Sequence, residues 1–139
     1  MDEAMKTLYI SDLDGTLLNP EALLSPSAAE RLNELLAKGL VFSVATARTA
    51  ATAADLVKPL TLSLPILLMN GVAVYDTKTK TYVKEHPMTR ETVQEVFKIL
   101  EKFNTPGFVY SIVDHKLMCY EPPKLNARMA AFMEERKRD

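Results

Sequence analysis

Two aspartates separated by one residue are the side chains of this sequence best suited to chemistry. Asp12 and Asp14 lie in a polar loop, residues 11–16, which directly follows the apolar run of residues 7–10. A carboxylate can attack phosphorus and divide a difficult transfer into two easier steps. A second carboxylate beside it can protonate the leaving oxygen and later take a proton from water. The pair therefore indicates phosphoryl transfer.

A phosphate dianion and two carboxylates would repel one another unless a cation lay between them. Mg²⁺ is a hard ion that prefers oxygen ligands, so the sequence predicts a Mg²⁺ site at Asp12 and Asp14. Gly15 allows the loop backbone to approach the phosphate and to point N–H groups at it. The hydroxyl group of Thr46 could donate a hydrogen bond to a phosphoryl oxygen.

The elements around this loop alternate between strand and helix. Three short apolar runs are expected to form buried strands: residues 7–10, 40–45 and 65–69. One helix is expected to start at Ser25 with Pro26, or at Ser27, and residues 49–57 should form a second one. Nearly continuous apolar strands in β-α-β-α-β order favour the α/β class, with a parallel sheet flanked by helices.

The carboxyl ends of these strands are where the polar candidates lie. In an open parallel sheet, ligands bind beyond the carboxyl ends of the strands. Asp12, Thr46 and Asn70 each follow one of the three predicted strands. We therefore expect these side chains to converge on one rim of the sheet.

The pattern changes after residue 70. Residues 72–75 and 81–83 are expected to form a hairpin, and residues 108–113 and 116–120 a second hairpin that turns at Asp114–His115. Thr89 is expected to cap the helix between the hairpins, and another helix should follow Pro122. The sequence therefore predicts a second module, joined to the first near residues 84–87.

Three segments resemble motifs of the haloacid dehalogenase (HAD) superfamily. Residues 11–18, Ser-Asp-Leu-Asp-Gly-Thr-Leu-Leu, match its D-x-D-G-T-L signature. Residues 44–48, Val-Ala-Thr-Ala-Arg, resemble the A-T-G-R of the Cof-type branch, with Ala47 in place of glycine. Asn70-Gly71 is similar to the N-G that ends the third strand in that branch. The resemblance implies a Rossmann-like HAD core, N-terminal part, over residues 1–84 and a partial α/β cap over residues 85–139.

The resemblance also implies roles for individual residues. Asp12 would be the nucleophile and Asp14 the general acid/base, and Asp12 with the backbone carbonyl of Asp14 would hold Mg²⁺. The remaining implied residues are Leu13 and Thr46 for binding phosphate, and Arg48, Asn70 and Gly71 as neighbours of the substrate. From the residues alone, Arg48 could equally be an ion-pair partner, and Asn70-Gly71 could equally be a turn.

The function implied is a Mg²⁺-dependent phosphatase of small phosphorylated metabolites, with sugar phosphates as the first substrate class. The alternatives are a phosphomutase and a catalytically incomplete fragment that only binds or assembles. The family's lysine motif and its second acidic motif do not appear in the sequence, so we expect a truncated chain. An open sheet edge or the partial cap would then favour a homodimer.

Composition excludes several other classes of function. The 139 residues carry a formal net charge of −1, which favours neither nucleic acid nor an anionic membrane as a partner. No apolar stretch approaches the roughly 20 residues of a membrane span, so we expect a cytoplasmic protein. The single cysteine, Cys119, lies in an apolar run and is expected to be buried.

Overall fold

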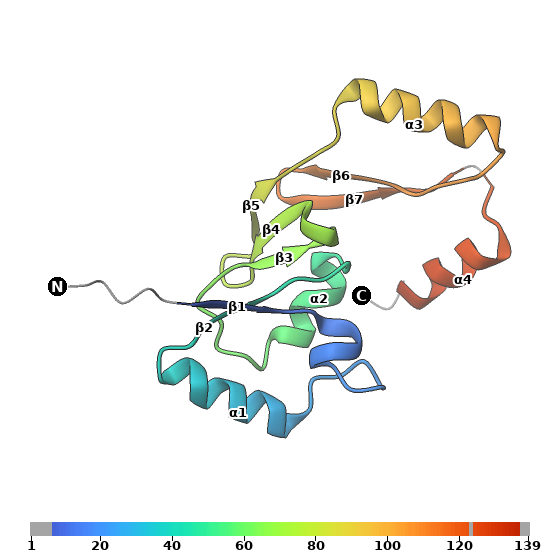
Figure 1. Ribbon diagram of the computed structural model, residues 1–139. Helices are drawn as coiled ribbons and strands as arrows, with labels where there is room; N and C mark the ends of the chain where they lie inside the picture. Colours follow the sequence, from blue (N-terminus) through green and yellow to red (C-terminus); the bar gives the residue numbers. More distant parts are fainter. Residues whose placement is uncertain (1–6, 123, 137–139) are drawn as a thin grey trace. The chain divides into compact units, whose positions relative to one another are not determined.

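The computed structural model describes residues 7–122 and 124–136 (Figure 1). Contacts group the chain into two compact units, one ending at His86 and the other beginning at Pro87. The boundary predicted from the sequence follows residue 84. The assignment of the two parts to a core and a partial cap stays a prediction.

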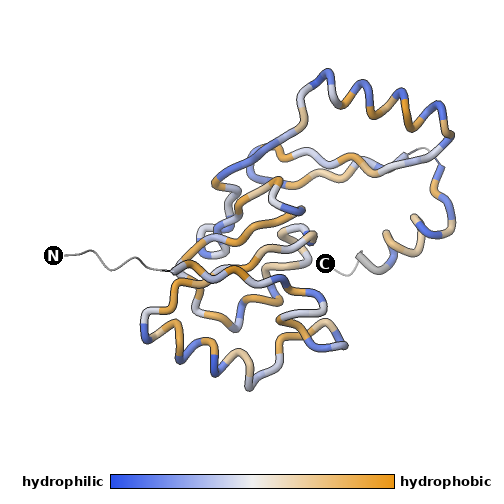
Figure 2. Tube along the Cα trace, in the orientation of Figure 1, coloured by the Kyte–Doolittle hydropathy of each residue, from blue (hydrophilic) through white to orange (hydrophobic). Residues whose placement is uncertain are grey.

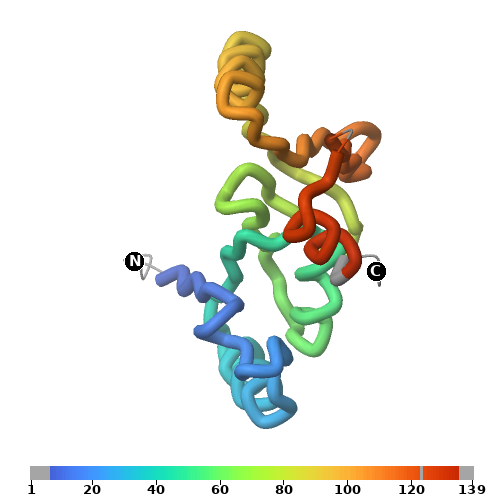
Figure 3. The backbone as a smooth tube through the Cα atoms, turned by 90° about the vertical axis from the view of Figure 1, so that its right-hand side faces the viewer, coloured from blue at the N-terminus to red at the C-terminus, as the bar shows by residue number. Residues whose placement is uncertain are grey.

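The first unit has the predicted alternation of strands and helices, which can also be followed in Figure 3. Its first elements are β1 (Leu8–Ser11), α1 (Pro26–Ala37), β2 (Val41–Val44), α2 (Ala50–Val57) and β3 (Ile66–Leu68). β1 and β2 pair in parallel, with Leu8 opposite Val41 and Ser11 opposite Val44. The predicted α/β class is confirmed.

Local capping explains where α1 begins and ends. Ser25 precedes the helix and its Oγ accepts a hydrogen bond from the Ala28 amide at 3.2 Å, so Ser25 and not Ser27 is the cap. Pro26 occupies the first turn, where its missing N–H costs no hydrogen bond. Gly39 follows the helix with φ +96°, a conformation that glycine adopts without strain.

Fewer residues of β3 pair in parallel than the predicted strand, residues 65–69, would allow. β3 meets the β2 side of the sheet through one parallel bridge, between Ala45 and Leu67. Pro65, just before β3, has no N–H to donate to a neighbouring strand. Its carbonyl oxygen accepts a hydrogen bond of 2.6 Å from the buried Ser43 hydroxyl. The expected burial of both strands is confirmed, because Val44, Ile66 and Leu68 are fully buried.

The prediction that residues 7–10 form a buried strand is wrong in its burial. Leu8, Tyr9 and Ile10 are each about half exposed, at 49%, 54% and 48%. Successive strand residues point to opposite faces, so both faces of β1 are open. Within the described residues β1 pairs only with β2, which leaves its other edge without a strand. A homodimer through this edge stays a prediction.

β3 also starts an antiparallel sheet with the next two strands, β4 (Ala73–Asp76) and β5 (Thr81–Glu85). Tyr75 and Tyr82 pack edge to face in this hairpin, with ring centroids 5.0 Å apart. Both rings are largely buried, and burial is the main cause that raises the pKa of each hydroxyl. The aromatic pair therefore fixes the hairpin against the first unit's core.

The described part of the second unit consists of two helices and a hairpin. Its elements are α3 (Arg90–Lys102), β6 (Val109–Val113), β7 (Lys116–Tyr120) and α4 (Ala127–Arg136). Thr89 caps α3, as predicted, because its Oγ1 accepts a hydrogen bond from the Thr92 amide. Asp114 and His115 form the predicted turn of the hairpin, and both have positive φ. Colour alternates between apolar and polar along α3 in Figure 2, which indicates an amphipathic helix.

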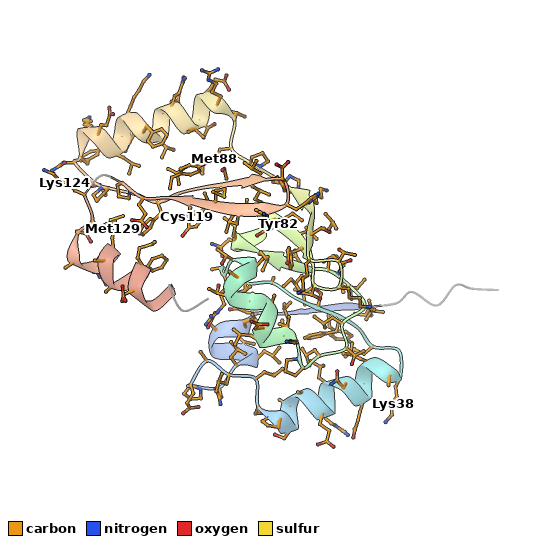
Figure 4. The ribbon with its side chains drawn as sticks, turned by 180° about the vertical axis from the view of Figure 1, so that it is seen from behind. Lys38, Tyr82, Met88, Cys119, Lys124 and Met129 are labelled. Carbon is orange, nitrogen blue, oxygen red and sulfur yellow. The ribbon has the colours of Figure 1, made fainter. Side chains whose placement is uncertain are left out.

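The predicted burial of Cys119 is wrong, because its thiol is exposed on β7 (Figure 4). β7 belongs to a two-stranded sheet, and four of its five residues are exposed, so an apolar sequence there does not imply a covered face.

None of the helices in the described part of the chain has the length and apolar character needed to cross a bilayer.

Candidate active site

A cavity of about 460 Å³ lies in the first unit at the carboxyl ends of its first three strands. Five of the residues predicted from the sequence line it together: Asp12, Asp14, Thr46, Asn70 and Gly71. The other lining residues are Ala45, Ala47 and Leu67. The expected convergence on one rim is therefore present in the structure.

The loop after β1 forms a wide turn, Leu13–Leu17, which contains Asp14 and is closed by a hydrogen bond of 2.9 Å from the Leu18 amide to the Leu13 carbonyl. Gly15 has φ +73° inside this turn, which is where the sequence needs a glycine. Asp12 caps the turn, since its Oδ1 accepts from the Leu13 amide at 2.7 Å. The other carboxylate oxygen of Asp12 accepts no hydrogen bond from the described residues.

The loops after β2 and β3 are joined by their backbones. The Asn70 amide donates to the Thr46 carbonyl at 3.1 Å, and the Met69 amide donates to the Arg48 carbonyl at 3.0 Å. These bonds hold Met69, Asn70 and Gly71 in three consecutive positive-φ conformations, at +53°, +58° and +89°. Asn70 and Gly71 thus form a turn and also line the cavity, and their role as neighbours of the substrate stays a prediction.

Arg48 forms a bidentate ion pair with Asp14. Its Nε donates to Asp14 Oδ2 at 2.8 Å and its Nη2 donates to Oδ1 at 2.7 Å. The hydrogen bond and charge of this guanidinium hold the pKa of Asp14 below its ordinary value, against a smaller opposing effect of burial. Arg48 is therefore an ion-pair partner, which is one of the two interpretations that the sequence allowed. It is not among the residues that line the cavity.

Thr46 is 5% exposed and nevertheless reaches the cavity. Its Oγ1 accepts a hydrogen bond of 3.2 Å from the Arg48 amide, which orients the hydroxyl group. An oxygen that accepts from the backbone keeps its own O–H free to donate elsewhere. Leu13, in contrast, has a fully buried side chain that does not line the cavity, and its amide already bonds Asp12.

The donor set of this cavity is made of hard oxygen ligands. Mg²⁺ is usually held by one or two carboxylates, with water and substrate phosphate completing its octahedron. Asp12 supplies a partly free carboxylate at the cavity, whereas the Asp14 carboxylate is engaged by Arg48. No group of three or more His, Cys, Asp or Glu residues suited to a metal occurs in the described ranges. The residues therefore fit part of a Mg²⁺ site.

Sequence reasoning missed the three apolar residues that complete the cavity wall. Ala45 and Ala47 are small, so they leave room beside the Thr46 hydroxyl. Ala47 stands where the resembling motif has glycine, yet it is not among the residues with positive φ. Alanine is therefore accommodated there without backbone strain. The run of alanines around Thr46 was the available signal for an open pocket.

Comparison with known families gives a match over most of the chain. The family described as haloacid dehalogenase-like hydrolase matches residues 9–139. Pyridoxal phosphate phosphatase YbhA of Escherichia coli (strain K12) is 32% identical over 112 residues, which cover 81% of this chain and 40% of YbhA. The 5-amino-6-(5-phospho-D-ribitylamino)uracil phosphatase YcsE of Bacillus subtilis (strain 168) is 31% identical over 98 residues, covering 70% of this chain and 39% of YcsE.

Solved structures show the same fold. The HAD subclass IIB sugar phosphatase BT4131 superposes with a TM-score of 0.69 at 22% identity, covering 95% of this chain and 49% of that protein. At this identity the likeness concerns the fold alone. The chain spans about two fifths of the length of the two curated relatives and about half of this structural neighbour.

Proposed function

This chain belongs to the haloacid dehalogenase-like hydrolase family, and on that premise we propose that it carries the nucleophile half of a Mg²⁺-dependent phosphatase. The substrates would be small phosphorylated metabolites, cleaved through an aspartyl-phosphate intermediate. The observation that supports this most directly is that Asp12, Asp14 and Thr46 line one cavity although they come from two different loops.

Asp12 is the proposed nucleophile because it lines the cavity and one of its carboxylate oxygens accepts no hydrogen bond from the described residues. That oxygen would form a bond to phosphorus while the bond from phosphorus to the ester oxygen breaks. Water would then attack the phosphorus of the acyl phosphate, which returns the Asp12 carboxylate and releases inorganic phosphate. The two displacements replace one difficult hydrolysis.

Asp14 is the proposed general acid/base, and the ion pair with Arg48 bears on that role. The low pKa favours the ionised carboxylate, the form that takes a proton from the attacking water. To protonate the leaving oxygen in the first step, Asp14 must carry a proton, which the guanidinium opposes. We therefore propose that Arg48 moves away from Asp14 when substrate binds and becomes a neighbour of the substrate.

Thr46 would donate its hydroxyl hydrogen to a phosphoryl oxygen, since its Oγ1 is already oriented by the Arg48 amide. Asn70 and Gly71 would contact the substrate from the opposite loop, which also lines the cavity. The Leu13 amide bonds Asp12 in this structure, so it would bind phosphate only after that hydrogen bond breaks.

Asp12 and the backbone carbonyl of Asp14 would hold Mg²⁺. The ion would offset the repulsion between the phosphate and the carboxylates and would stabilise charge on the phosphoryl oxygens. Sugar phosphates remain the first substrate class that we propose. Pyridoxal phosphate is the next, because the relative that bears it in its name is 32% identical to this chain.

The direct test is hydrolysis of p-nitrophenyl phosphate with Mg²⁺, comparing the chain with Asp12→Ala. Glu30→Ala is the matched control, because Glu30 is an exposed carboxylate on α1. We expect Asp12→Ala to abolish turnover, EDTA to do the same, and Glu30→Ala to keep the original rate. A panel of sugar phosphates and pyridoxal phosphate would then rank substrates. A wild-type rate equal to that of Asp12→Ala would refute the proposal for this chain.

A further inference from the structure

A second cavity of about 600 Å³ lies in the first unit and is not lined by Asp12 or Asp14. Its walls are α2, the loop that follows α2, and the turn between β4 and β5. It shares no lining residue with the cavity that contains Asp12 and Asp14. A volume of this size is within the range of about 300–1,000 Å³ that small-molecule sites occupy.

The floor of this cavity is apolar and buried. Val57, Leu60, Leu62 and Tyr75 line it and are exposed by 2%, 7%, 3% and 9%. Three alanines of α2 lie along one wall and leave space where larger side chains would fill it. Such a floor can accept the apolar body of a ligand, with polar groups at the rim fixing its orientation.

Three lysines stand at the rim: Lys58 after α2, and Lys78 and Lys80 in the β4–β5 turn. Among the described lining residues Asp55 is the only acidic one, so the lining carries a formal charge of +2. Asp76 lies beside the lining, and its carboxylate bonds the Lys78 and Thr79 amides. None of the three lysines forms an ion pair with a carboxylate elsewhere in the described part of the chain. We call this feature the lysine cavity.

The turn that presents two of these lysines has a fixed backbone. The Asp76 carboxylate accepts hydrogen bonds from the Lys78 amide at 2.7 Å and the Thr79 amide at 3.1 Å. An aspartate that accepts from amides two and three residues ahead stabilises the turn from within its own sequence. Lys80 then takes a positive φ of 57° before β5 begins. The attachment points of both lysines are therefore set before a ligand arrives.

We propose that the lysine cavity binds a small phosphate ester as a dianion, at a site separate from the catalytic cavity. The positive excess of the lining suits a phosphate dianion, and the apolar floor suits a compact ring or chain attached to it. Without a cation, the carboxylates of the catalytic cavity would repel the same ligand. The proposal does not depend on the proposed phosphatase activity.

Phenylphosphonate is a suitable probe, because its carbon–phosphorus bond resists hydrolysis. It would be titrated into the ¹⁵N-labelled chain in EDTA at mildly alkaline pH, where the probe is a dianion. We expect saturable amide shifts in residues 54–62 and 75–80. Changing Lys58, Lys78 and Lys80 together to glutamine should weaken binding at least about tenfold. Asp55→Asn should tighten it, because the acidic side chain of the lining loses its charge.

The matched control changes three other exposed lysines to glutamine, Lys38 (labelled in Figure 4), Lys84 and Lys98, which gives the same net charge. We expect this control to bind as the original chain does. Equal weakening in the control would show that only net charge matters and would overturn the site. Shifts centred on residues 12–16 and 69–71, or shifts that do not saturate, would overturn it as well. If the triple variant does not fold, Asp55→Asn still tests the site, because it alters a single exposed side chain and should tighten binding.

Discussion

Removal of the Arg48 guanidinium is expected to raise the pKa of Asp14 and to cost a small, pH-dependent part of the stability. The pair is bidentate at 2.7 and 2.8 Å, with side chains 25% exposed for Arg48 and 51% exposed for Asp14. Arg48→Met keeps the apolar stem, and Asp14→Asn keeps the shape of the carboxylate. Together with the double variant they form a thermodynamic cycle, in which loss of the bond from Arg48 to the Thr52 carbonyl cancels.

The magnitude follows from exposure. Two unit charges about 4 Å apart attract by about 1 kcal/mol in water, and ordering two flexible side chains offsets part of this. Solvent screens the half-exposed Asp14, whereas the bidentate geometry favours the pair. We therefore expect a coupling energy of about 0.5–1 kcal/mol at neutral pH. High salt should reduce it.

The pH dependence has a definite sign. The pKa of Asp14 is lower in the folded protein than in the unfolded chain. Its stabilisation is therefore fully present above the pKa of the unfolded chain, an ordinary aspartate value of about 3.9, and is lost as pH falls through the lower folded-state pKa. Urea unfolding gives the coupling energy, and a ¹³C titration of the Asp14 carboxyl gives its pKa directly. An Asp14 pKa that does not change in Arg48→Met would refute this reasoning.

Three further substitutions or reactions test the structure. Ser43→Ala should destabilise by about 1–2 kcal/mol in urea, because the Pro65 carbonyl loses its buried donor, whereas Ser63→Ala at an exposed position should change little. Gly71→Ala should cost about 1 kcal/mol from its φ of +89° alone, since a Cβ there meets no atom within 4 Å; a neutral variant would contradict that backbone. Cys119 should react with a thiol reagent in the folded protein at the rate of a free thiol, and protection until urea is added would show that it is covered.

Features that depend on neighbours in sequence could be predicted from it. Ser25 and Thr89 cap helices because their hydroxyls reach amides three residues ahead, a distance set by helix geometry alone. Asp114 and His115 turn the second hairpin because the two β-prone runs around them leave two residues for the connection. Convergence on the rim followed from strand order, since parallel strands bring their carboxyl ends together.

Features that depend on distant partners could not be predicted. Arg48 and Asp14 are 34 residues apart, and nothing in either local sequence specifies that their side chains pair. The apolar runs of β1 and of β7 around Cys119 both predicted burial, but burial requires a covering layer that a strand's own sequence does not encode. The hydrogen bond from the Ser43 hydroxyl to the Pro65 carbonyl likewise joins residues 22 positions apart.

The strained loop after β3 indicates that the rim of the catalytic cavity is formed before any ligand binds. Only one of its three consecutive positive-φ residues is a glycine; asparagine tolerates this region better than most residues do, so the strain lies mainly at Met69. The Met69 and Asn70 amides donate to the Arg48 and Thr46 carbonyls, so the loop after β2 holds them there. The two residues whose carbonyls accept these bonds, Thr46 and Arg48, also carry the hydroxyl at the cavity and the guanidinium that pairs with Asp14. A backbone shift at Asn70 would therefore displace both groups. The strain therefore couples the two loops of the cavity, and rearrangement on binding should be confined to the Arg48 side chain and to the hydrogen bond between Asp12 and the Leu13 amide.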